Sequence, residues 1–371
     1  MTTENVRDYL TSGPKFGEGE VIERIEVFRK RRPRLIDNVV TLAHGAGGKA
    51  SAALVDAVFL EAFRNPHLES LGDGAVLDLP GGQQMALSTD SFVVQPLVFP
   101  GGSIGHLAVH GTVNDLAMAG AVPSWITAAF VLEEGFAIAD LKEIVADMAT
   151  AAAAAGVQIV TGDTKVVPKG AADGLFITTA GVGIVPPGRH LSPHAVRPGD
   201  RLLVSGTIGD HGMAVMLARG DLAIEADIAS DTAAVSELVE VLMAAAPATR
   251  WLRDPTRGGV ATVCNELAAD TNLAVVLDEE HLPVRAPVAG ACEMLGIDPL
   301  YVANEGKFLA VVAPEEAQAA LTALRAHPLG ADAADIGAIT EQPAATVVVR
   351  TGFGGTRIVD KLVGDPLPRI C

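Results

Sequence analysis

The pattern of hydrophobic and polar positions changes near residue 35. Before this point the residues are polar and charged without a clean period, which predicts an N-terminal extension over residues 1–35. After it, short apolar runs alternate with segments of helical spacing, a pattern typical of an α+β fold. We predict strands at 39–42, 85–89, 126–132, 157–160, 175–184, 200–205, 273–277 and 308–312. We predict helices at 103–119, 141–155, 235–244 and 260–269.

A further helix is predicted after the glycine-rich turn at residues 44–48. Its apolar face would hold Leu54, Val55, Val58 and Ala62. The turn is not a P-loop, because Ala43 stands where that motif needs glycine and Ala50 where it needs Ser or Thr. A glycine turn that opens a helix can still bind an anion through free N–H groups, although a plain tight turn fits equally well.

Prolines divide the rest of the chain. Pro186 and Pro187, followed by Gly188, predict a boundary between two α+β domains at 36–186 and 187–350. Pro366 and Pro368 would keep the last segment extended, so residues 351–371 are predicted to form a flexible tail.

Composition excludes several classes of protein. A net charge of −18 argues against nucleic acid and anionic membranes as partners. The basic stretch at 29–34 is either a solvated arm or a docking site for an acidic partner. Because no apolar run reaches transmembrane length and no signal-peptide pattern opens the chain, we expect a cytoplasmic protein.

Aspartates recur at turns and strand ends of the first predicted domain. The candidates are Asp73, Asp90, Asp115 with its neighbour Asn114, and Asp163. Hard oxygen ligands of this kind suit Mg²⁺ that holds a triphosphate, although single aspartates also form turns and cap helices. Lys165 stands two residues after Asp163, so on an extended segment both side chains would point the same way.

Two motifs of the second half carry charged residues beside glycines. Residues 254–259 precede a predicted helix, where Asp254 or Thr256 could be a cap. Arg257 is electrostatically unfavourable at a helix start and therefore suggests an anion or a domain contact. Residues 304–307 precede a predicted strand, and Glu305 there is either solvated in a turn or a general base.

The three cysteines differ in their surroundings. Cys264 and Cys292 lie on apolar helix faces and are predicted to be in the core. Cys371 follows prolines at a polar terminus, so we expect an exposed thiol that is either used chemically or serves as a handle. Metal binding by Cys371 alone is weakly supported, because no nearby Cys or His accompanies it.

Together these motifs resemble the HypE family of hydrogenase maturation proteins, within the AIR synthase-like (PurM-like) superfamily. The matching segments are 44–48, 71–77, 87–93, 111–120, 161–165, 254–259, 304–307 and the Pro-Arg-Ile-Cys end at 368–371. The resemblance implies a two-domain fold, with first domains that pair into a β-barrel-like core of a homodimer and a second domain that is an α/β sandwich. Residues 1–35 fall outside it.

The resemblance also implies a reaction. A partner carbamoyltransferase, HypF, would carbamoylate the Cys371 thiol, and this chain would use ATP to dehydrate the carboxamide to a cyanide. The cyanide would pass to iron on a HypC–HypD complex, for nickel–iron hydrogenase. Asp73, Asp90, Asp115 and Asp163 would hold Mg²⁺, and with His44, Gly47, Gly48 and Asn114 they would bind ATP. Cys371, Glu305 and Lys165 would be catalytic.

Two other functions compete with this one. A related ligase, such as an AIR synthetase or a selenophosphate synthetase, would share the aspartate motifs. A selenophosphate synthetase should carry a reactive Cys or selenocysteine in an N-terminal glycine-rich loop, yet no cysteine precedes Cys264 here. The second alternative is a non-catalytic interaction protein whose terminal cysteine is a docking handle.

Overall fold

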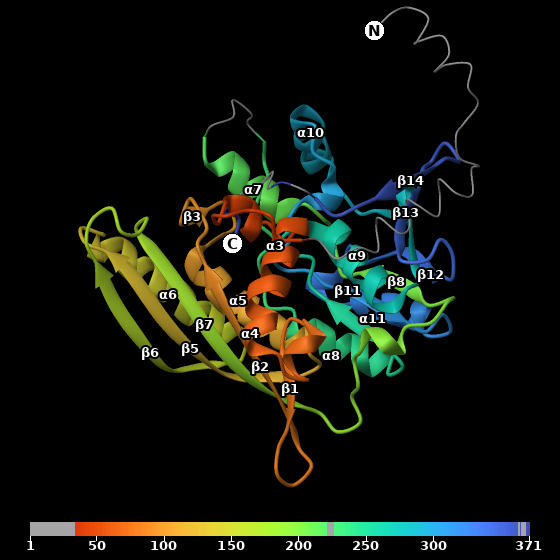
Figure 1. Cartoon of the computed structure of the whole chain (residues 1–371), viewed down its shortest axis with the longest axis horizontal. Coiled ribbons are helices and arrows are strands. Elements are labelled where there is room, and N and C mark those ends of the chain that lie inside the picture. The colour runs from red at the N-terminus through yellow and green to blue at the C-terminus, as the bar shows by residue number, and fades with distance from the viewer. Residues whose placement is uncertain (1–33, 221–225, 363, 365–368) are drawn as a thin grey trace, which may run out of the picture.

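Two β-sheets and the helices packed on them make up the chain (Figure 1). The structure is a computed structural model that describes residues 34–220, 226–362, 364 and 369–371. The predicted extension at 1–35 and the basic stretch at 29–34 therefore lie almost entirely outside the described residues. No helix in the described part of the chain is long and apolar enough to cross a membrane.

The first sheet has five strands in the order β1-β2-β7-β5-β6. Their bounds are β1 Ala75–Asp78, β2 Gln84–Phe92, β5 Val122–Glu133, β6 Gln158–Val167 and β7 Leu175–Val185. All neighbours are antiparallel except β5 and β6. Helices α5 (Ile104–Met118) and α6 (Ile138–Ala154) contact each other, and α5 also packs on the sheet. The sheet is open, with β6 at its outer edge (Figure 1).

The second sheet has seven strands in the order β14-β13-β10-β12-β8-β11-β9. Their bounds are β8 Arg201–Val204, β9 Trp251–Arg253, β10 Ala274–Asp278, β11 Leu309–Val312, β12 Ala334–Thr340, β13 Thr346–Arg350 and β14 Thr356–Val359. Alternate residues of β8 serve the two faces: Leu202 and Val204 share a core with α9 (Gly259–Thr271), whereas Leu203 packs with α8 (Ser236–Ala245) and α11 (Ala317–Arg325).

Shorter elements complete the fold. They are η1 Leu42–Gly45, α3 Lys49–Leu54, η2 Val55–Leu60, α4 Glu61–Phe63, η3 Leu68–Ser70, β3 Val98–Phe99, β4 Gly102–Ser103, η4 Pro193–Ala195, α7 Asp210–Ala218, η5 Glu279–His281, α10 Ala286–Leu295, η6 Pro299–Tyr301 and η7 Pro328–Gly330. Helix α7 shares an apolar cluster with the first domain and with Ile370 and Cys371.

Most predicted strands and helices are present, with three differences. Residues 39–42 are not a strand, and η1 begins at Leu42. The predicted apolar face of the first helix is wrong, because Val58 is 43% exposed while Ala53 and Leu60 are buried instead. Residues 356–359 form the edge strand β14, paired with β13, so the first part of the predicted tail belongs to the second sheet.

Candidate active site

A polar cavity of about 260 Å³ lies where the two sheets approach each other. We call it the acidic cavity. The side chains that line it come from β2, α5, β9, α9, the loops around Asp73, Asp254 and Glu305, and the end of the chain. They include Asp73, Thr89, Asp90, Asp115, Arg253, Asp254, Arg257, Thr262, Glu266, Glu305 and Cys371. Elements far apart in sequence therefore bring six carboxylates and the Cys371 thiol to one place.

Three carboxylates form the densest part of the acidic cavity. Oxygens of Asp73, Asp115 and Asp254 all lie within 4.8 Å of one another. Asp73 pairs with Arg253 Nε at 2.8 Å, and Ser88 Oγ donates to Asp115 Oδ2 at 2.5 Å. Burial raises the pKa of Asp73 to about 6, against the pull of Arg253. Burial and the neighbouring carboxylates raise the pKa of Asp115 and Asp254 well above the usual range.

This donor set fits a hard divalent cation. Carboxylate oxygens are the ligands Mg²⁺ prefers, and a cation would offset both the burial of these charges and their mutual repulsion, which together raise the pKa values. Thr262 Oγ1, which is buried at the same cavity, has no hydrogen-bond partner among the described residues. An unpaired buried hydroxyl costs free energy unless something else binds it, so the cavity favours a polar ligand.

Glu305 and Arg257 also line the acidic cavity. Glu305 is only 3% exposed, and burial raises its pKa well above the usual range, with Asp254 and Asp90 adding to the effect. Arg257 opposes that shift. Within the described residues, Arg257 has no carboxylate at ion-pair distance, so its guanidinium is available to an anion in the cavity.

The loop that carries Glu305 is held by the neighbouring segment. Asn114 Nδ2 donates to the Glu305 carbonyl oxygen at 2.9 Å and to Ala233 O at 2.9 Å, while its Oδ1 accepts from Val235 N–H at 2.8 Å. A Cβ on Gly306 would lie 1.8 Å from the Asp231 carbonyl oxygen, so only glycine permits this contact. Asn114 is thus engaged in positioning Glu305 and does not line the cavity, unlike its predicted role in binding ATP.

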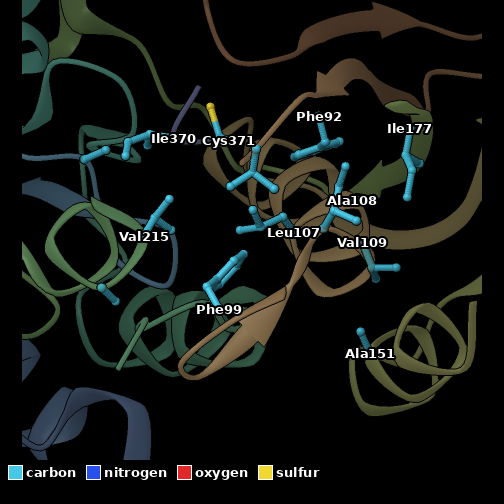
Figure 2. Packing of buried hydrophobic residues seen from close by; sticks show 14 of the residues in the cluster. Phe92, Phe99, Leu107, Ala108, Val109, Ala151, Ile177, Val215, Ile370 and Cys371 are labelled. Atoms are coloured by element: carbon cyan, nitrogen blue, oxygen red, sulfur yellow. The ribbon is translucent and has the colours of Figure 1, made fainter. Parts of the chain in front are cut away.

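The end of the chain is docked beside the acidic cavity. Val93 N–H donates to Cys371 O at 3.0 Å and Gln95 N–H donates to Arg369 O at 3.2 Å. Because these two backbone bonds join residue 93 to 371 and residue 95 to 369, the last residues run antiparallel to the segment after β2. The side chain of Arg369 also contacts this segment, since its Nε donates to Val93 O at 2.9 Å. Figure 2 shows Ile370 and Cys371 at the edge of the apolar cluster, with the sulfur on its outer side.

Docking buries the Cys371 thiol, contrary to the exposed thiol expected from the sequence. Cys371 is 6% exposed, and burial raises the pKa of its thiol to about 12 even though Arg257 lowers it. The residue lines both the acidic cavity and an adjoining cavity of about 160 Å³, which we call the tail cavity. The docked thiol is therefore a neutral group placed next to Arg257 and Glu305.

The remaining candidates lie elsewhere in this chain. Asp163 and Lys165 point the same way, as predicted, and form an ion pair at 2.6 Å. Both are exposed on β6, however, and neither lines the acidic cavity. Within a single chain, Asp163 and Lys165 therefore do not join the residues of the acidic cavity.

The glycine-rich turn is only partly at the site. Gly47 lines the acidic cavity, and a Cβ there would lie 2.8 Å from Arg257 O. Gly48 packs on Leu362, whose carbonyl oxygen would be 2.4 Å from such a Cβ. His44 is buried, with Nδ1 bonded to Thr41, and lines neither cavity. Close packing thus accounts for Gly48 and His44 better than contact with a phosphate does.

Two cavity residues had only a weak signal in the sequence. Asp254 was considered as a helix cap, whereas it completes the carboxylate cluster directly after β9. Arg253, the last residue of β9, was not singled out and pairs with both Asp73 and Glu266. The sequence signal for both residues is their adjacent position at the end of a strand, where charged side chains often line a site.

Comparison with known proteins supports a family assignment. The N-terminal domain of AIR synthase related proteins matches residues 71–185, and the C-terminal domain matches 197–350. Carbamoyl dehydratase HypE of Azotobacter vinelandii is 54% identical over 332 residues, which are 90% of this chain and 97% of that protein. A crystal structure of a HypE–HypF complex contains a chain that is 49% identical, with a TM-score of 0.79, covering 84% of this chain and all of that one. A HypE structure in complex with ATP is 46% identical, with a TM-score of 0.75, covering 90% and 100%.

Proposed function

The chain belongs to the HypE family of carbamoyl dehydratases, and from this premise we propose that it dehydrates an S-carbamoyl group on its own Cys371 to a thiocyanate, with ATP as the activating substrate. The observation that carries the proposal is the buried Cys371 thiol at the wall of a carboxylate-rich cavity. The cyanide group formed there would supply nickel–iron hydrogenase assembly.

The reaction needs an activated oxygen, because an amide oxygen is a poor leaving group. Transfer of the γ-phosphoryl group to the carbamoyl oxygen, with loss of one N–H proton, gives an imidate phosphate and ADP. Removal of the second N–H proton then forms the C≡N bond as the C–O bond breaks and phosphate leaves. The S-carbamoyl group has lost the elements of one water, and the conversion of ATP to ADP and phosphate has taken them up.

The residues of the acidic cavity suit both steps. Asp73, Asp115 and Asp254 would hold Mg²⁺, which supplies charge neutralisation for phosphoryl transfer when bound. Arg257 would bind the phosphoryl oxygens at the wall shared with Cys371. Glu305 would remove the N–H proton, and its raised pKa makes it a stronger base than an exposed glutamate once ionised. Asp90 would be a further carboxylate that lines the cavity.

In a homodimer, the exposed ion pair of Asp163 and Lys165 on β6 would have a role in the reaction. Ile159, Val160 and Val166 are 41%, 55% and 67% exposed on this edge strand, and unprotected apolar edges favour pairing with a second copy. Pairing of the β6 edges would give the barrel-like core implied by the family. Asp163 and Lys165 could then act at the acidic cavity of the partner chain.

Relatives suggest the partners of the reaction. A related HypE is described in complex with HypF, so HypF carbamoyltransferase is proposed to load Cys371 here. Delivery to a HypC–HypD complex and a cytoplasmic location are part of the same proposal. Residues 364–371 span at most about 23–25 Å when extended, which would let the thiol move between cavity and partner.

Nucleotide consumption tests the function. The purified chain, carbamoylated on Cys371 by HypF, should release one ADP per thiol and then stop, because each chain carries one substrate. Cys371→Ser should fold and bind ATP but release no ADP in this reaction. Repeated turnover by Cys371→Ser would exclude a substrate on the chain itself. Binding of ATP without any ADP release by the carbamoylated protein would favour the alternative of a non-catalytic docking protein.

A further inference from the structure

His211 joins the docked end of the chain to helix α7. Its Nε2 lies 2.9 Å from the Ile370 carbonyl oxygen, and its Nδ1 lies 2.8 Å from Ser230 Oγ. The side chain is fully buried, with its ring edge-on to Phe99 at a centroid distance of 5.6 Å. A buried imidazole with both nitrogens engaged has one orientation available to it.

The hydrogen bonds around His211 determine which nitrogen carries the proton. Ser230 Oγ accepts from Thr232 N–H at 3.1 Å, so the Ser230 hydroxyl proton is free to be donated to His211 Nδ1. Burial lowers the pKa of His211, with Asp231 and the Ile370 carbonyl opposing, so the neutral ring is favoured. Nε2 therefore carries the hydrogen and donates it to Ile370 O.

This contact holds the residue next to the thiol. Each carbonyl of the last three residues has a donor: Gln95 N–H and Arg219 Nη2 for Arg369, His211 for Ile370 and Val93 N–H for Cys371. Two of these donors belong to the backbone after β2, whereas His211 lies on α7 of the second domain and Arg219 directly follows that helix. The end of the chain is thus fixed from both sides, at the wall shared by the acidic cavity and the tail cavity.

We propose that His211 is a positioning residue that latches the end of the chain, through the Ile370 carbonyl, in the orientation that places the Cys371 group at Arg257 and Glu305. Its relevance to catalysis rests on the proposed function, although the latch itself does not. The latch opposes the outward movement needed for loading of the thiol. Loss of His211 therefore slows dehydration but does not slow loading of the thiol, whereas loss of a merely structural histidine would slow both.

The test compares His211→Leu, which removes the donor, with His211→Gln, whose amide N–H reaches about the same place as Nε2. His281→Leu makes the same chemical change at an exposed histidine and is the control. Timed alkylation of the intact protein, read by mass on the C-terminal peptide, measures escape of the docked thiol. Losing one hydrogen bond should speed alkylation of Cys371 about 3- to 10-fold in His211→Leu, with most of the difference restored in His211→Gln.

Single-turnover dehydration should slow by a similar factor in His211→Leu, while carbamoylation by HypF stays equal or becomes faster. Unchanged alkylation in both folded variants would overturn the latch. A uniform loss of all three rates, together with a lowered melting temperature in both variants, would also overturn it in favour of a structural histidine. Faster alkylation in a protein that makes no thiocyanate would keep the latch and reject the proposed function.

Discussion

Asp115→Asn should stabilise the protein in the absence of divalent cations. The variant keeps the shape of the side chain and the acceptor for Ser88 Oγ, and it removes one of three carboxylates whose oxygens lie within 4.8 Å of one another. At that distance two charges repel by about 3 kcal/mol for an effective dielectric constant near 20. Asp115 itself has a pKa well above the usual range, because of burial first and then the neighbouring carboxylates Asp254 and Asp73.

The figure of about 3 kcal/mol is an upper value, because partial protonation relieves some of the repulsion. We expect a gain of about 1–3 kcal/mol at pH 7.5. With an unfolding entropy of about 2.1 cal/mol/K per residue, a chain of this length shifts its melting temperature by roughly 1–1.5 °C per kcal/mol. The expected rise is therefore about 1–4 °C, measured by calorimetry in EDTA. Asp78→Asn, at an exposed carboxylate, is the matched control.

The same carboxylates give the pH dependence a definite sign. A folded-state pKa raised above the unfolded value means that this contribution to stability is complete below the unfolded pKa and is lost as pH rises through the folded value, about 6 for Asp73. Metal-free wild type should lose stability between about pH 5 and pH 7, and Asp115→Asn should lose less. Mg²⁺ should raise the melting temperature of wild type above pH 7 and have little effect on the variant. A pH-independent wild type, together with a neutral or destabilising Asp115→Asn, would refute this reasoning.

Three further predictions concern the reacting groups. Glu305→Gln should bind ATP normally and lose dehydration of the carbamoylated thiol by at least about 100-fold, as expected for a general base; a normal rate in a quench assay would remove Glu305 from that role. Lys165→Ala, at an exposed site, should leave the melting temperature unchanged and lower turnover. If Lys165 acts across the dimer, mixing Lys165→Ala with Cys371→Ser should restore activity in heterodimers. An inactive mixture would contradict action across the dimer. Cys371 in the native protein should be alkylated at pH 8 about 1000-fold more slowly than in urea, because a thiol pKa near 12 in place of 9.0 leaves that much less thiolate; equal rates would mean that the end of the chain is not docked.

Periodicity predicted most elements because the buried faces of the two sheets are continuous apolar surfaces. It failed for the first helix, where Val58 and Phe59 are 43% and 48% exposed although their spacing matches a core-facing helix. That spacing reports only that a helix has an apolar face, and it cannot tell what covers the face. The fold leaves these two side chains uncovered within one chain.

The candidate site was predicted in part. Asp73, Asp90, Asp115, Glu305 and Cys371 do meet at one cavity. The burial of Cys371 could not be foreseen, because it depends on backbone pairing with Val93, 278 positions earlier, and on His211 from another domain. Strand geometry predicts that Asp163 and Lys165 lie on the same side of β6, as their ion pair shows. Their separation from the cavity depends on the strand order of the sheet, which places β6 at its edge.

The mass of the C-terminal peptide tests the central claim most directly. After carbamoylation by HypF, incubation with ATP and Mg²⁺ should convert the peptide that ends in Cys371 from the carbamoylated mass to one lighter by a single water, and no other peptide should change. A carbamoylated peptide whose mass stays the same while ADP accumulates would contradict the account.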